Sequence, residues 1–492
     1  MPEELAFDDL VKKLYDTLLL RGVEHIELPV QLSVNLSGIS HRLSQAQSQF
    51  LRTRQAALEA AGSLLQAQIN AAGRLVDALG AGVAPLYNAL SGVLAAPTCP
   101  EEKPDTAQPY PAKPAIFNRQ NLEEFAVGSM AKCFGPEFAI FEGRRHPRIP
   151  NGDLLLMDRV TALEGERLNF RTPAAIEVEY ELPEDAWFFR DNHSSSPPYS
   201  ILMEIGLQPC GLLSAYLGTA LLAPNEEFFF RNLDGQALLS SLPDVRGRTI
   251  TTNARLITHL VSGDTIIQKY AFALSCLGET FFSGQAVFGY FSPQAMASQM
   301  GLDGGRSIPP LLERDSSLFG RWIDLQTPFT AARPLGRTER FKWRLPSGQL
   351  SLIRNVFVSL EGGANQQGYA FASKDIDPRD WFYDCHFYQD PVMPGSLGVE
   401  AMLQTMEVLA LEKGLADRFT TPRFDLVPGQ ETIWKYRGQI LPTNKIMKLE
   451  AQAREVEIRT DQTILRADCS LWVDGNRIYE VEGAAISIRE GY

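Results

Sequence analysis

A histidine and a glutamate lie fourteen residues apart in the last quarter of the chain, with a proline–glycine pair between them: His386, Pro394, Gly395 and Glu400. Histidine suits a general base because its ordinary pKa, about 6.5, lies near neutral pH. A carboxyl group in an apolar site can act as an acid, because burial raises its pKa. A glycine at a helix start can present its backbone N–H to a developing oxyanion. The segment therefore offers a base, an acid and an anion-stabilising group.

The sequence around these residues favours a site over a structural role. A lone histidine among aromatic residues is usually structural, but the run Asp390–Gly395 contains two prolines, which a core strand does not tolerate. Proline after a tight turn suits a helix start instead. Glu400 and Gln404 share one helix face, so that face is exposed to solvent or the carboxylate points into a site. Cys385 is a weaker candidate for a nucleophile, because neighbours in an extended segment point to opposite sides.

The elements that hold this segment occur twice. The spacing between Pro394, Glu400 and Gln404 is repeated by Pro198, Glu204 and Gln208. Each proline leads into a long apolar helix, expected over about 200–222 and 396–413. Each helix is followed by β-rich segments: 248–257, 265–276 and 280–291 after the first, and 432–440, 446–456, 463–473 and 477–488 after the second.

One helix followed by several antiparallel strands, found twice, predicts an α+β fold built as a tandem (double) hotdog. In each unit an antiparallel sheet wraps a long central helix. A single unit would leave apolar surface and a sheet edge exposed, so the two units are expected to pair. We place the first hotdog unit at 115–300 and the second at 315–492.

The N-terminal part is predicted to be different. Residues 1–96 are expected to form a helical N-terminal or linker region, because apolar residues recur at helical spacing from about Ser37 to Ile69. A docking or linker helix fits better than a coiled coil, since polar residues interrupt the seam. Residues 97–114 are rich in proline and are predicted to be an extended linker.

Bulk composition excludes several classes of protein. The 492 residues carry a net charge of −13, which argues against nucleic acid as the main ligand. Mean hydropathy is −0.12 and no run of eighteen apolar residues appears, so we expect no membrane span. The N-terminus shows no signal peptide, which predicts a cytoplasmic protein. Six scattered cysteines indicate neither a zinc site nor a disulfide framework, so no metal and no cofactor are expected.

The segment Trp381–Gln404 closely resembles the active-site segment of the bacterial β-hydroxyacyl thioester dehydratases, which include the β-hydroxydecanoyl type. The block from about 115 to 492 resembles the paired-hotdog dehydratase region of polyunsaturated fatty acid synthases, as Arg148–Arg159 and Pro198–Ile205 also show. The resemblance implies a lyase, a 3-hydroxyacyl-[acyl carrier protein] dehydratase that forms a 2-enoyl thioester and can also shift the new double bond. It further implies a polyketide-synthase-like assembly that carries the substrate on the phosphopantetheine of an acyl carrier protein.

The resemblance also implies which groups work together. In that family two hotdog units face each other across a two-fold axis, so the histidine of one unit meets the carboxylate of the other. Both units lie on one chain here, as an internal pseudo-dimer, and the chain could in addition form a homodimer. The implied dyad is His386 with Glu204. Glu400 would then face the place where the first unit should supply a histidine.

The first unit looks degenerate at that place. Arg190 stands fourteen residues before Glu204, the segment before the helix is two residues shorter, and Tyr199 replaces the counterpart of Gly395. One working site is the favoured interpretation. A second site that uses His193 through a distorted loop is the alternative.

We assign the oxyanion contact to Gly395 and substrate binding to Pro394, Ser396, Gln208 and Gln404. Two other functions stay open: an acyl thioesterase, because hotdog units also hydrolyse thioesters, and a non-catalytic docking scaffold of a megasynthase. Two basic stretches, 144–148 and the cluster at 333–344, are interpreted as solvated surface. Docking of an acidic carrier protein or its phosphate is the alternative for them.

Overall fold

The computed structural model describes residues 113–263, 265–325 and 345–491. The chain divides into two compact parts, Met1–Gln108 and Pro109–Tyr492, and every described residue belongs to the second part. Below, the first and second units are the two hotdog units. The predicted N-terminal helical region, the linker before residue 113 and the basic cluster at 333–344 lie outside the described residues.

Two long helices form the centres of the two hotdog units. Helix α6 spans Tyr199–Tyr216 and α10 spans Gly395–Glu412, each with a proline at its N-cap. The first helix ends earlier than expected because Gly218 adopts a left-handed conformation (φ 77°) before a 3-10 turn, Thr219–Leu222. By length and composition alone, Tyr199–Leu222 could cross a membrane. Most of it is buried in the protein, as a central hotdog helix must be.

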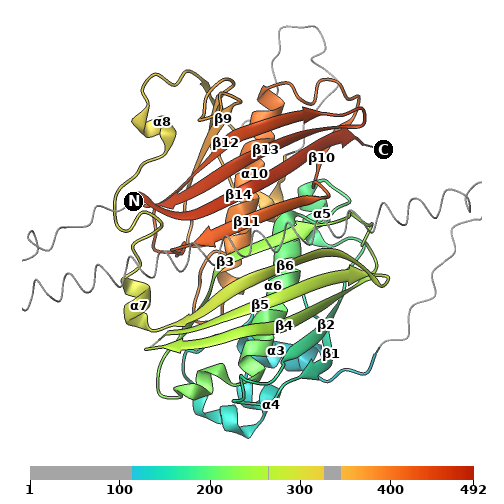
Figure 1. Ribbon diagram of the computed structural model, residues 1–492, viewed down its shortest axis with the longest axis vertical. Coiled ribbons are helices and arrows are strands. Elements are labelled where there is room, and N and C mark those ends of the chain that lie inside the picture. The colour runs from blue at the N-terminus through green and yellow to red at the C-terminus, as the bar shows by residue number, and fades with distance from the viewer. Residues whose placement is uncertain (1–112, 264, 326–344, 492) are drawn as a thin grey trace, which may run out of the picture. The chain divides into compact units, whose positions relative to one another are not determined.

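The strands of both units join into one antiparallel sheet (Figure 1). Its order is β1-β2-β4-β5-β6-β3-β11-β14-β13-β12-β9-β8-β7, and β10 pairs with β14. The first unit contributes β1 (Arg159–Glu164), β2 (Ala175–Glu181), β3 (Phe229–Leu239), β4 (Thr249–Ser262), β5 (Thr265–Cys276) and β6 (Glu279–Phe291). The second contributes β7 (Arg321–Asp324), β8 (Asn355–Ser359), β9 (Tyr369–Asp375), β10 (Pro422–Asp425), β11 (Gln430–Tyr436), β12 (Ile446–Ile458), β13 (Gln462–Val473) and β14 (Asn476–Glu490).

Shorter helices flank this frame: α3 (Arg119–Val127), α4 (Met130–Phe134), α5 (Trp187–Asn192), α7 (Pro293–Ala297), α8 (Leu311–Arg314) and α9 (Phe382–Cys385). Figure 1 shows α6 crossing the sheet of the first unit and α10 crossing that of the second. Along β5 every second residue is buried, as a sheet packed by one face on a helix requires. The tandem hotdog prediction is confirmed. Sequence analysis missed β3, whose polar residues break the alternation of buried positions.

The seam between the units is a pair of strands, β3 and β11. They run antiparallel with Trp434 opposite Gly235. A side chain at Gly235 would overlap the indole, because its Cβ would lie 2.1 Å from the ring of Trp434. The glycine therefore lets the two units approach closely enough to share ladder hydrogen bonds.

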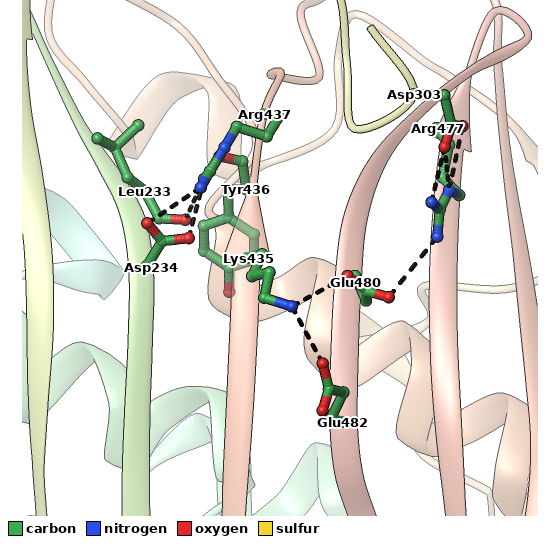
Figure 2. A network of polar contacts seen from close by, with 9 residues as sticks. All are labelled: Leu233, Asp234, Asp303, Lys435, Tyr436, Arg437, Arg477, Glu480 and Glu482. Atoms are coloured by element: carbon green, nitrogen blue, oxygen red, sulfur yellow. Dashed lines mark hydrogen bonds and ion pairs between the residues drawn. The ribbon is translucent and has the colours of Figure 1, made fainter. Parts of the chain in front are cut away.

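Side chains near the seam add a polar network (Figure 2). Arg437, just after β11, donates to the carbonyl of Leu233 at 3.2 Å and pairs with Asp234 at 2.9 Å, both in β3. Arg477 of β14 pairs with Asp303 at 2.7 Å and so holds the connection between the units. The network favours one register of the two units, because its partners come from separate parts of the chain.

Candidate active site

One cavity of about 100 Å³ contains the predicted dyad, His386 and Glu204, together with Gly395. His386, Gly395 and Ser396 come from the second unit, and Glu204 and Gln208 come from the first. All five line the same pocket although they lie far apart in sequence. The structure thus brings His386 and Glu204 together across the seam.

His386 follows α9, in a loop that folds back on itself. Its Nδ1 lies 2.9 Å from the carbonyl oxygen of Val392, so Nδ1–H donates and Nε2 keeps its lone pair for a substrate proton. Burial lowers the pKa of His386 to about 4, an effect opposed by the Glu204 carboxylate. The imidazole is therefore neutral near pH 7, as a general base must be.

Glu204 lies in the first turns of α6 with both carboxyl oxygens engaged. Ser396 Oγ lies 2.6 Å from Oε1, and Gln208 Nε2 donates to Oε2 at 3.0 Å. The Gln208 amide is itself fixed, since it donates to the Leu154 carbonyl and accepts from the Leu156 N–H. Ser396 and Gln208, predicted to bind substrate, therefore orient the carboxyl group in this structure.

Gly395 is the first residue of α10, and Pro394 is its N-cap. Among the described residues no side chain caps this helix, and the N–H groups of a first turn have no intrahelical partner. A Cβ on Gly395 would lie 2.6 Å from the ring of Tyr436. Glycine is thus required by the packing of Tyr436. Gly395 lines the pocket, and the N–H groups at a helix start can bind an anionic oxygen.

Arg231 was not found by sequence analysis, yet it ties the histidine loop to the other unit. It lies in β3 and binds both carboxyl oxygens of Asp390 at 2.7 Å. Asp390 lies in the loop between His386 and the start of α10, and both charged side chains are almost buried. The sequence around Asp390 does not predict this contact, because Arg231 lies 159 residues away.

Replacing Arg231 by methionine should destabilise the protein by about 3 kcal/mol, because it leaves the Asp390 carboxylate buried and unpaired. Urea denaturation followed by tryptophan fluorescence would measure this loss. The double variant Arg231→Met/Asp390→Asn should recover part of the stability, because no unpaired charge remains. Equal stability of the single variant and the wild type would show that the pair is not a structural clamp.

The counterpart of this pocket, formed by the residues before α6 and by one face of α10, is arranged differently. Glu400 accepts a hydrogen bond from the Ser200 N–H at 3.2 Å, so the start of α6 is already occupied by a carboxylate. Burial raises the pKa of Glu400. The cavity beside it, which we call the twin pocket, measures about 20 Å³, and no histidine is among its described lining residues. Tyr199, which stands in place of Gly395, lines it.

Three residues from the sequence analysis lie away from the His386 pocket. His193 caps α5 in a left-handed conformation, and its Nε2 lies 3.0 Å from Ser347 Oγ. Gln404 donates to the Leu350 carbonyl at 2.9 Å, so its amide is used within the second unit. Cys385 lies outside the pocket lining, and burial raises the pKa of its thiol. The structure does not place His193 beside Glu400.

The basic stretch at 144–148 is used inside the protein. Arg144 donates to the carbonyls of Pro224 and Asn225, and Arg145 donates to that of Phe228. Arg148 is buried and donates to the Phe125 carbonyl at 2.8 Å. These contacts hold the segment before β1 against the first unit, which favours a structural role over docking of a carrier protein.

Comparison with known proteins places this site in context. Residues 345–482 match the FabA-like domain family. A polyunsaturated fatty acid synthase protein of Thraustochytrium sp. is 35% identical over 393 residues, which cover 75% of this chain and 26% of the relative. The chain resembles the paired-hotdog dehydratase region of such synthases. It thus spans about a quarter of the length of the curated relative that it matches.

Solved structures are more distant. The dehydratase domain from the CurF module of curacin polyketide synthase is 11% identical with a TM-score of 0.37, covering 68% of this chain and 98% of that one. The 12:0-ACP thioesterase from Umbellularia californica is 9% identical with a TM-score of 0.35, covering 64% and 94%. At these TM-scores neither likeness decides between dehydration and hydrolysis. The sequence matches support a dehydratase-type hotdog domain.

Proposed function

We propose that this chain removes water from a β-hydroxyacyl thioester carried on an acyl carrier protein and releases a 2-enoyl thioester. The observation that carries the proposal is the shared pocket of His386 and Glu204 beside the uncapped start of α10. A base, an acid and an oxyanion donor then surround one substrate. The assembly that supplies the carrier protein is proposed to be a polyunsaturated fatty acid or polyketide-type synthase, as in the relatives.

Each group has one role in this mechanism. Nε2 of His386 removes the proton from the α-carbon, and the thioester oxygen takes up negative charge against the Gly395 N–H. The C–O bond to the β-hydroxyl then breaks, and Glu204 protonates the leaving oxygen to give water. Ser396 can serve both states of Glu204, since a hydroxyl donates to a carboxylate and accepts from a carboxylic acid. A proton passed from His386 to Glu204 resets the site, and no cofactor is required.

The same base can act a second time. If the enoyl product stays bound, His386 can remove a γ-proton and return it to the α-carbon, which moves the double bond by one position. This isomerisation is part of the proposal, and it requires no additional residue.

The test is hydration of a trans-2-enoyl thioester, followed as loss of the enoyl absorbance. Hydration is the reverse of the proposed step and uses the same groups. A parallel assay for free thiol measures hydrolysis. Thiol release without loss of the enoyl group would point to a thioesterase. No turnover of free or carrier-bound substrates would point to a docking scaffold.

The low pKa of His386 predicts the acid limb of the pH profile. Burial lowers that pKa to about 4, so the imidazole is neutral above this pH and protonated below it. We expect kcat/KM to fall as the pH drops through about 4 and to show no acid limb near 6.5. Initial rates of hydration in overlapping buffers would measure the profile. An acid limb near 6.5 would show that His386 is better solvated than the structure indicates.

A further inference from the structure

One face of α6 lies at the active-site pocket and the matching face of α10 lies at the twin pocket. The two faces differ at their last position. Residues at i, i+3, i+4 and i+7 form each face: Glu204, Leu207, Gln208 and Gly211 in α6, and Glu400, Leu403, Gln404 and Glu407 in α10. The match is structural as well, because Gln208 and Gln404 donate to the equivalent carbonyls of Leu154 and Leu350 at 2.8 and 2.9 Å. Glycine and glutamate thus occupy the same place in the two units.

In the first unit this face forms one side of an apolar arm of the active-site pocket. Glu204, Leu207 and Gly211 all line that pocket, and seven helical residues span roughly 10 Å. Phe230 and Phe288 line the same pocket, from β3 and β6. Their rings stack at 4.9 Å with planes 3° apart. The arm therefore leads away from the catalytic carboxyl group along apolar groups.

Gly211 keeps this arm open. A Cβ at this position would lie 3.2 Å from the ring of Phe230. That ring cannot move easily, because it stacks on Phe288 and also contacts Tyr290, with ring centroids 4.9 Å apart. A larger side chain at 211 would have to enter the pocket instead.

The twin pocket shows what such a side chain does. Glu407 is buried there, and its Oε2 has no hydrogen-bond partner within the described part of the chain. Burial, together with the nearby Glu400, raises its pKa well above the usual range, which favours the uncharged acid. The cavity beside it is about a fifth of the volume of the active-site pocket, at about 20 against about 100 Å³.

We infer that the arm beside α6 receives the acyl chain of the substrate and that Gly211 sets the longest chain that it admits. This inference rests on the proposed function and goes beyond it. It also gives the acyl chain a path along α6. In the structure the pocket follows α6 and meets α10 only at its first residues, Gly395 and Ser396.

The test compares two substrates that differ only in acyl length, the pantetheine thioesters of trans-2-butenoic and trans-2-decenoic acid. In Gly211→Leu we expect kcat/KM for the decenoyl thioester to fall by about 30-fold or more, and that for the butenoyl thioester to change by less than about threefold. Phe230→Leu should shift the preference the other way, toward the longer substrate. The matched control is Glu407→Gln in the twin pocket, which should leave both rates unchanged.

Two outcomes would overturn the inference. Equal losses for both substrates would show that the arm holds the pantetheine instead, and no loss for the longer one would show that Gly211 sets no limit. If near-UV circular dichroism shows that Gly211→Leu is not folded, Gly211→Ala and Phe230→Leu decide the question. If the wild type hydrates neither acyl group, as the pantetheine thioester or on a carrier protein, the proposed function fails. Calorimetric binding of butanoyl- and decanoyl-pantetheine to the same variants then tests the length limit by itself.

Discussion

His386→Ala should lower kcat for enoyl hydration by about 10³-fold or more, because the site loses the group that removes the α-proton in dehydration and returns it in hydration. Val392 orients the imidazole through Nδ1, and within the described residues of this pocket no other histidine can replace it. The fold should persist, since the removed ring makes only this one side-chain hydrogen bond in the described structure. Steady-state rates and the thermal unfolding midpoint, measured on the same preparation, would check both statements.

The matched control is His193→Ala. His193 lies in the first unit near the position where a second catalytic histidine was considered, and its ring contacts Ser347. We expect this variant to keep activity within about twofold of the wild type, as surface substitutions away from a site usually do. A large loss in His193→Ala would bring back the two-site interpretation. Full activity of His386→Ala would contradict the proposed dehydratase mechanism.

The second large effect concerns two glutamates that occupy equivalent places. Glu204→Gln should lower kcat by about 10²- to 10⁴-fold, because an amide can neither protonate the hydroxyl that leaves in dehydration nor accept the proton of the water that adds in hydration. Glu400→Gln should leave kcat nearly unchanged, since Glu400 is bound to the Ser200 N–H in the twin pocket. The pair is a demanding comparison, because the same substitution is made at symmetry-related positions.

Rates of both variants with one enoyl thioester would decide the assignment. If Glu400→Gln is inactive and Glu204→Gln is active, the working dyad lies within the second unit. If both are inactive, each half depends on the other for its geometry. A single site built across the seam requires that only Glu204→Gln loses activity.

Much of this fold could be predicted from the sequence, because the spacing pattern of one hotdog unit is repeated in the other. The equal spacing of Pro198, Glu204 and Gln208 and of their counterparts indicated both central helices and the strands that follow them. In these helices and strands apolar residues recur at regular spacing, because one face of each element is buried. The strands before each helix are shorter or less regular, and β3 hides its role behind polar residues that belong to the seam.

The details of the site were less accessible. Arg231 pairs with Asp390 across 159 residues, and no local pattern announces such a contact. Ser396 and Gln208 were assigned to the substrate, but their hydrogen bonds go to Glu204. Spacing identifies residues that share a helix face, whereas the partner of a hydrogen bond depends on packing between elements. The roles of His386 and Glu204 stay predictions until the variants are measured.

The two hotdog units, joined by the ladder between β3 and β11, are encoded in one chain, and this has a consequence for how the protein can evolve. In a homodimer one substitution appears in both active sites, so a lost histidine silences both. Here each half has its own codons, and the covalent link holds the halves at a high effective concentration. One pocket can therefore lose its catalytic groups and gain tighter packing, such as Tyr199 and Glu407, while the other keeps its chemistry. Joining the partners in one chain releases half of the molecule from the constraint of symmetry.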